Sequence, residues 1–200
     1  MEMRYELSGT TDEKIMNCLK AAGWHKGRQA EISGVKAFYE SCGIVLPAGA
    51  ENFLREYYGI AEGWHMNTEG WVKGWHGHRV RQRADIAFEL FPLRGMDNSW
   101  YAEEITDSEF LAELRRTEAF AGESLVWIGQ IGYYYPANVY AGTTGKIYTT
   151  HDYDDIIHSY DSVPELLRYD FDEADSWHYV IMEDIVYDVN DPRGWGDDMQ

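Results

Sequence analysis

The stretch from Ser124 to Gly145 constrains the fold most, because it carries no charged side chain in a chain whose formal net charge is -18. A membrane-spanning helix could explain such a run, but this one contains Gln130, Pro136 and Asn138, together with several glycines. Its tyrosines lie in the middle of the run, whereas the aromatic residues of membrane helices gather at the two ends. We therefore expect a pair of buried strands here.

Three helices are predicted before residue 60. In the first, Ile15, Met16 and Leu19 recur at helical spacing, and Thr11 or Asp12 can cap the free amides of the first turn. Glycine or proline marks the ends of the other two, as is usual for helix boundaries. The three segments run from Thr11 to Gly23, from Ser33 to Ser41, and from Pro47 to Gly59.

The residues between and after these helices form an ordered set of motifs. The first turn reads Ala22-Gly23-Trp24-His25-Lys26-Gly27-Arg28, and Leu46-Pro47 opens the third helix. Later come Ser124–Gly129, a tight turn over Gly142–Lys146, and Val163–Leu167. In this order the motifs resemble the SUKH superfamily of bacterial immunity proteins, and within it the third subfamily. The resemblance covers roughly two-thirds of the chain and rests on the order of elements rather than on a catalytic signature.

The resemblance implies a fold and a function. The fold is α+β: a single domain with a mostly antiparallel sheet of five to six strands, flanked by helices. That domain would cover residues 1–175, with an insertion near 61–105, and residues 176–200 would form an extension with a frayed tail. The function implied is to bind a cognate polymorphic toxin, often a nuclease or deaminase in this superfamily, and to neutralise it by stoichiometric occlusion. No catalytic activity, cofactor, metal or small-molecule substrate is expected.

Alternation and turn residues predict the remaining elements. Ile86, Phe88 and Leu90 alternate within Asp85–Phe91, with Trp71–Trp75 as the expected partner strand. Thr106-Asp107 can cap a helix that runs to about Ala121. Further strands are expected at Leu125–Ile131, Tyr133–Ala141, Lys146–His151 and within Asp152–Tyr160, followed by a short helix that Ser162 caps.

The excess of acidic residues bears on the kind of partner. A strongly negative protein repels nucleic acid and anionic membranes, and it meets a basic protein more quickly. The same charge can also serve solubility alone. We therefore expect a protein partner, and no nucleic acid and no membrane.

The candidate contact residues follow from the densest acidic segment. Carboxylates on a rigid hairpin can mimic phosphates or pair with the basic active site of a toxin, and tyrosines are frequent at the centre of protein interfaces. A solvated acidic face is the simpler interpretation of the same segment. The predicted partner-binding residues are Asp152, Tyr153, Asp154, Asp155, Tyr160, Asp161 and Glu165, with the two tyrosines as anchors.

Two other kinds of site were weighed. His65, His76 and His78 lie close together, but no Cys or carboxylate completes a zinc set at a standard spacing, so surface histidines are the preferred interpretation. A basic run, Lys73 to Arg83 with Trp71 and Trp75 nearby, has the composition of a single-strand binding site. In so acidic a chain, intramolecular pairing explains it better.

Two alternatives to a toxin-binding role remain. An enzyme would need a metal or nucleotide site, and neither a nucleophile elbow nor a nucleotide-binding glycine motif is found in the sequence. A non-catalytic regulatory or scaffold protein with several partners has the same sequence signature as an immunity protein. Cys18 and Cys42 are expected to be reduced thiols in a cytoplasmic protein, since two cysteines form no disulfide framework and no signal peptide is recognisable.

Overall fold

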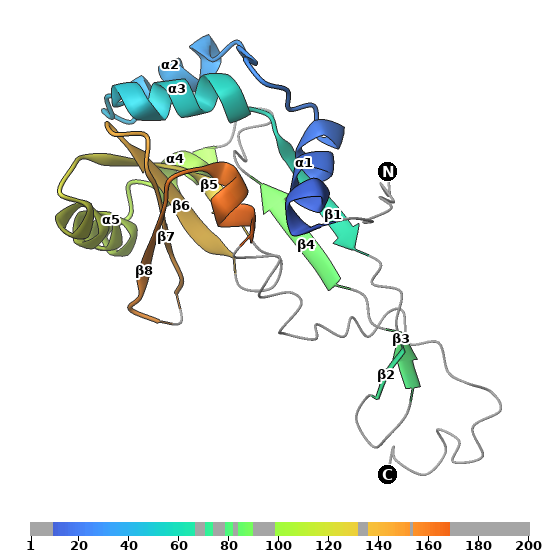
Figure 1. The fold of residues 1–200 in the computed structure, drawn as a ribbon. Coiled ribbons are helices and arrows are strands. Elements are labelled where there is room, and N and C mark those ends of the chain that lie inside the picture. The colour runs from blue at the N-terminus through green and yellow to red at the C-terminus, as the bar shows by residue number, and fades with distance from the viewer. Residues whose placement is uncertain are drawn as a thin grey trace.

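A computed structural model describes residues 10–66, 71–73, 79–81, 84–89, 99–131, 136–152 and 154–168, and for the described residues within 61–89 and for 99–100 it describes the backbone alone. Helices pack on an antiparallel sheet (Figure 1), so the predicted α+β class is confirmed. The expected extension at residues 176–200 lies outside the described residues, as does part of the expected insertion near 61–105.

Four consecutive antiparallel strands form the centre of the sheet, in the order β5-β6-β7-β8. Every residue of β6 and β7 is buried, because helices cover both faces. The pair of buried strands predicted from the uncharged run is thus confirmed. The strands are β5 (Leu125–Ile131), β6 (Ala137–Gly142), β7 (Ile147–Thr150) and β8 (Ile157–Tyr160).

Two further strands extend the order to β1-β4-β5-β6-β7-β8. Within the described part of the chain, the antiparallel pair β1 (Ala61–Met66) and β4 (Ala84–Glu89) meets β5 through two register positions of β4. The strand predicted at Asp85–Phe91 therefore exists, but its expected partner is wrong. β2 (Trp71–Lys73) pairs instead with β3 (Arg79–Arg81) in a separate two-stranded sheet, since these two are close along the chain.

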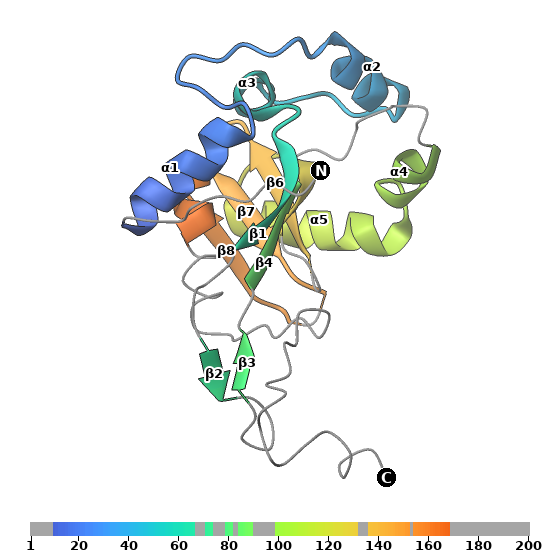
Figure 2. The same cartoon turned by 90° about the vertical axis from the view of Figure 1, so that its right-hand side faces the viewer.

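Helices lie on both sides of the sheet. Figure 2 shows α1 and α5 on opposite faces, with α2 and α3 across one end. The helices predicted near residues 11–23, 33–41, 47–59 and 107–121 are all present, and α4 was not predicted. They are α1 (Thr11–Ala21), α2 (Ser33–Ser41), α3 (Ala48–Tyr57), α4 (Ser99–Glu104) and α5 (Ser108–Ala121), followed by a short helical segment at 163–168.

The cap of α1 differs from the expected one. Thr10, rather than Thr11 or Asp12, is the N-cap. Its Oγ1 accepts a hydrogen bond from the Glu13 amide at 3.3 Å, and Glu13 Oε2 accepts one from the Thr10 amide at 2.8 Å. The Thr10 amide, and then the Thr10 hydroxyl, donate hydrogen bonds to the Glu13 carboxylate and lower its pKa, because they favour its ionised form.

A bulge in β5 is tied to α2. The register with β6 shifts between Trp127 and Gly129, and Gly129 takes a positive φ of 138°. The Tyr39 hydroxyl donates a hydrogen bond to the Trp127 carbonyl beside this bulge. A buried carbonyl at an irregular point of a ladder thereby gains a donor, and α2 is fixed against the sheet.

The turn after α1 docks on the end of α3 through Trp24 and Arg28. Arg28 Nη1 and Nη2 donate to the carbonyls of Glu56 and Tyr58 at 2.9 and 2.7 Å. Trp24 stacks on Tyr57 with ring centroids 6.3 Å apart, and its Nε1 donates to Glu56 Oε1 at 3.1 Å. A guanidinium suits this position, because it supplies two donors to the last carbonyls of a helix.

Candidate protein-binding surface

The predicted contact residues lie around β8, the last strand in the sheet order. Asp152 precedes β8 and is exposed. Among the described residues it makes no hydrogen bond or ion pair. Tyr153 lies outside the described residues. The acidic segment therefore lies at one edge of the sheet, next to the edge strand β8.

Asp155 connects this edge to α5. Its side chain is 98% exposed, and its Oδ1 pairs with Nη1 of Arg116 from the middle of α5. A pair this exposed contributes about 0–1 kcal/mol, so it fixes geometry more than stability. A partner's cation could therefore compete for Asp155 at small cost.

Asp161 is also paired within the chain. Lys146 Nζ lies 3.2 Å from Asp161 Oδ1, and both side chains are largely exposed. The hydrogen bond that Lys146 donates to Asp161, and then the negative charge of Asp161, raise the pKa of Lys146. The two ion pairs place one cation each beside carboxylates predicted to contact a partner.

Asp154 and Glu165 have local structural roles. Asp154 Oδ1 accepts from the Ile156 amide at 2.9 Å, and Glu165 Oε2 accepts from the Asp161 amide at 2.8 Å. The predicted cap at Ser162 is confirmed, since its Oγ accepts from the Glu165 amide at 3.3 Å. The carboxylates of Asp154 and Glu165 therefore hold the backbone in place before and after β8.

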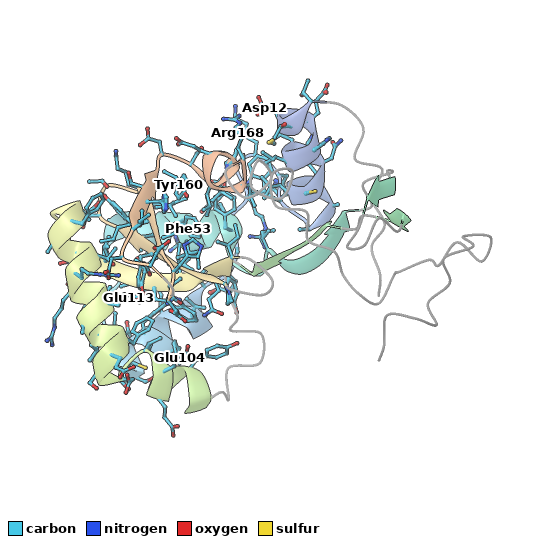
Figure 3. All side chains as sticks on the ribbon, turned by 90° about the horizontal axis from the view of Figure 1, so that it is seen from below. Asp12, Phe53, Glu104, Glu113, Tyr160 and Arg168 are labelled. Atoms are coloured by element: carbon cyan, nitrogen blue, oxygen red, sulfur yellow. The ribbon has the colours of Figure 1, made fainter. Side chains whose placement is uncertain are left out.

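Tyr160 was expected on the partner-binding surface, but it is buried. It is 7% exposed and belongs to the core, where its ring stacks on His158 with centroids 6.4 Å apart. Alternation along a four-residue strand explains this, because one face of β8 turns toward the helices. Figure 3 shows Tyr160 among the packed side chains. The predicted surface position of Tyr160 is therefore wrong.

Two exposed apolar side chains, one on α5 and one just before β8, were not predicted from the sequence. Phe120 on α5 is 58% exposed, and Ile156 just before β8 is 55% exposed. Helical spacing carried a signal for Phe120. The inward stripe of α5 runs through Phe110, Leu114 and Thr117, and Phe120 falls off that stripe.

A buried polar network lies between α5 and the sheet. Glu113 Oε1 accepts from Tyr140 at 2.6 Å, from Asn138 Nδ2 at 3.3 Å and from the Thr150 hydroxyl. Trp127 Nε1 extends the network by donating to Asn138 Oδ1 at 3.2 Å. Burial, and then the hydrogen bond to Glu113, raise the pKa of Tyr140. The Trp127, Tyr140 and Thr150 donors are all used within the network, so it specifies packing.

Glu104 lies on α4, on the same side of the sheet as Glu113 (Figure 3). Among the described residues its buried Oε2 finds no hydrogen-bond donor. Burial, and then the charge of Asp152, raise the pKa of Glu104. Within the described part of the chain, no group of three His, Cys, Asp or Glu side chains could hold a metal ion.

The other candidates from the sequence fall elsewhere. The side chains of His65, of His76 and His78, and of the basic run from Lys73 to Arg83 lie outside the description. Cys18 is buried, and burial raises the pKa of its thiol to about 11, which makes it unreactive.

Comparison with protein-family models, with curated proteins and with solved structures finds no match to this chain. No helix among the described residues is long and apolar enough to cross a membrane.

Proposed function

We propose that this chain is a SUKH-like immunity protein that neutralises a basic toxin domain in the cytoplasm by covering it. One observation supports this most: five carboxylates gather around β8 in a chain of net charge -18. They are Asp152, Asp154, Asp155, Asp161 and Glu165. In this proposal β1 and β4 complete a six-stranded SUKH-like sheet, and the protein acts by occupancy, without turnover.

The arrangement favours docking over chemistry. Asp154 and Glu165 are held by backbone amides, and Asp155 and Asp161 by intramolecular cations. Carboxylates fixed in this way present negative charge with little conformational freedom to lose on binding. Long-range attraction would speed the encounter, and specific contacts would then set the lifetime of the complex.

The test is association kinetics with the toxin domain encoded beside this gene, inactivated in its catalytic residue. Changing Asp152, Asp154 and Asp155 together to Asn should lower the association rate several-fold at low salt, since each change removes a charge from the docking face. Asn at position 154 can still accept from the Ile156 amide, so the fold should be retained. The difference in association rate between this variant and the natural protein should shrink in about 1 M salt, where charges more than about 3 Å apart are largely screened.

A matched control separates local from total charge. Glu40, Glu103 and Glu109 are exposed on α2, α4 and α5, and changing all three to Gln alters the net charge by the same amount. This variant should associate nearly as fast as the natural protein. Equal slowing in both variants, or in neither, would show that the acidic segment is not the docking face.

A further inference from the structure

We infer that basic residues of the toxin replace Arg116 and Lys146, the two cations of this chain that pair with its own docking carboxylates. The inference rests on the proposed function and deepens it, because it states how the partner's cations enter the acidic face. In the free protein, Arg116 pairs with Asp155 and Lys146 pairs with Asp161. Binding would therefore be an exchange of cations at carboxylates that are already in position.

The Lys146–Asp161 pair lies on the face of the sheet that α5 covers. The Tyr148 hydroxyl donates to Glu123, just after α5, at 3.2 Å, which places Tyr148 on that face. Alternate side chains of a strand share a face, and Lys146 comes two residues before Tyr148. Asp161 comes two residues after Ser159, which is opposite Tyr148 in the register of β7 and β8. Both partners of this ion pair therefore follow the alternation that leads to the α5 face.

The Arg116–Asp155 pair lies on the same face, because Arg116 belongs to α5 itself. Phe120 is one helical turn after Arg116, and side chains four residues apart share a side of a helix. Its ring packs edge-on against Tyr148, with centroids 6.5 Å apart, and is 58% exposed. An apolar side chain of a partner could cover this ring while its cations reach the carboxylates.

Both pairs have the geometry of contacts that exchange readily. Arg116 donates to Asp155 through Nη1, and among the described residues its buried Nε finds no acceptor. The two-pronged pairing that makes Arg–carboxylate contacts strong is therefore incomplete. Lys146 and Asp161 are 51% and 78% exposed, and ion pairs this exposed add little to stability.

Charge identifies the occupant. When Asp155 and Asp161 lose the cations of their own chain, only a partner that supplies other cations restores the balance of charge. A second copy of this chain carries the same net charge of -18 and would be repelled. The surface fits a basic protein that presents Lys or Arg beside an apolar side chain.

Removing the intramolecular cations tests the inference. Arg116→Gln and Lys146→Gln should each bind the inactivated toxin domain up to about fivefold more tightly, the range that the small worth of an exposed ion pair allows. Lys20 and Lys26 supply matched controls, because they are exposed on α1 and in the turn after it. Changing either of them to Gln alters the net charge equally and should change the affinity much less.

A double-mutant cycle separates exchange from a general change of charge. In an Asp155→Asn background, the gain from Arg116→Gln should vanish, because there is no carboxylate left to release. The gain from Lys146→Gln should vanish likewise in Asp161→Asn. Phe120→Ala should dissociate several-fold faster, since the partner covers its ring.

The outcomes separate the two proposals. If the natural protein fails to bind the toxin domain, the proposed function is overturned. If it binds, the exchange of cations is overturned by any of three results, and the acidic docking face still stands. These are a gain in Arg116→Gln no larger than in Lys20→Gln, a gain that persists without Asp155, and unchanged dissociation of Phe120→Ala.

Discussion

At the scale of single residues, close backbone contacts set the sharpest constraints. Gly49, in the first turn of α3, faces the connection between β6 and β7. A Cβ at this position would lie 2.6 Å from the Gly145 amide nitrogen and 2.7 Å from the Thr143 carbonyl oxygen. Backbone atoms cannot swing aside as a long side chain can. The helix therefore approaches the turn as closely as it does only because residue 49 is glycine.

Gly49→Ala should destabilise the protein by about 1–3 kcal/mol, the usual cost of forcing extra volume into a packed site. Gly34 in α2 is the matched control, since an added Cβ there meets nothing within 4 Å. Gly34→Ala should stabilise by roughly 0.5–1 kcal/mol, because alanine favours the helix and restricts the unfolded chain. Chemical denaturation of both variants measures the two effects. Equal changes would mean that α3 does not abut the turn.

At the scale of elements, the turn after α1 holds α3 by its carboxyl-terminal end. Trp24 is partly buried, and its indole combines a stack on Tyr57 with a hydrogen bond to Glu56. Arg28 adds two donors to neighbouring carbonyls. The turn Ala22–Arg28 thus connects α1 to the carboxyl-terminal end of α3.

Trp24→Ala should lower the unfolding free energy by about 1–3 kcal/mol, less than the roughly 3–5 kcal/mol of a fully buried ring. Trp24→Phe should recover much of that loss, because it keeps the stack and gives up only the Nε1 hydrogen bond. Neither variant should alter toxin binding, since the joint is remote from β8. Impaired binding with an unchanged melting curve would move Trp24 into the interface.

Local signals predicted the helices well, and they predicted less about contacts between distant segments. The caps and glycines around Ser33–Ser41 and Ser108–Ala121 are short-range features, so the expected bounds agree closely with the structure. Strand pairing is long-range: Ala61–Met66 has little β-branched character and was not predicted, although it pairs with β4. At the candidate surface, the cluster of acidic residues could be predicted from the sequence. The burial of Tyr160 and the exposure of Phe120 and Ile156 depend on packing that no single segment encodes.

At the scale of the whole molecule, ionisable groups make opposite contributions to folding stability as the pH changes. Burial, and then Asp152, raise the pKa of Glu104, so its charge costs stability above that pKa and the cost fades as pH falls toward 4.5. The pKa of Asp107 is lowered, chiefly by the Glu109 amide. The pKa of Glu123 is also lowered: burial raises it, but hydrogen bonds from Thr144 outweigh this. These two groups stabilise above their unfolded pKa values and lose that contribution as pH falls through the folded ones.

Stability should therefore be greatest at mildly acidic pH, between these two regimes. Glu104→Gln should raise the melting temperature at neutral pH and flatten the decline above the optimum. Glu123→Gln should weaken the loss on the acid side, since an uncharged side chain cannot titrate. Thermal melts from pH 3 to 8 test both. If the melting temperature of Glu104→Gln near pH 7 equals that of the natural protein, the Glu104 carboxylate is adequately solvated.

Asp12 at the start of α1 pairs with Arg168 at the end of the segment 163–168, and Figure 3 shows the two side by side. The chain thus leaves the described fold close to where it enters. A fold with adjacent ends can be grafted into a surface loop of an unrelated host, because both junctions need span only a short gap. Residues 10–168 could then be inserted into a host as an internal module, with both junctions beside the Asp12–Arg168 ion pair.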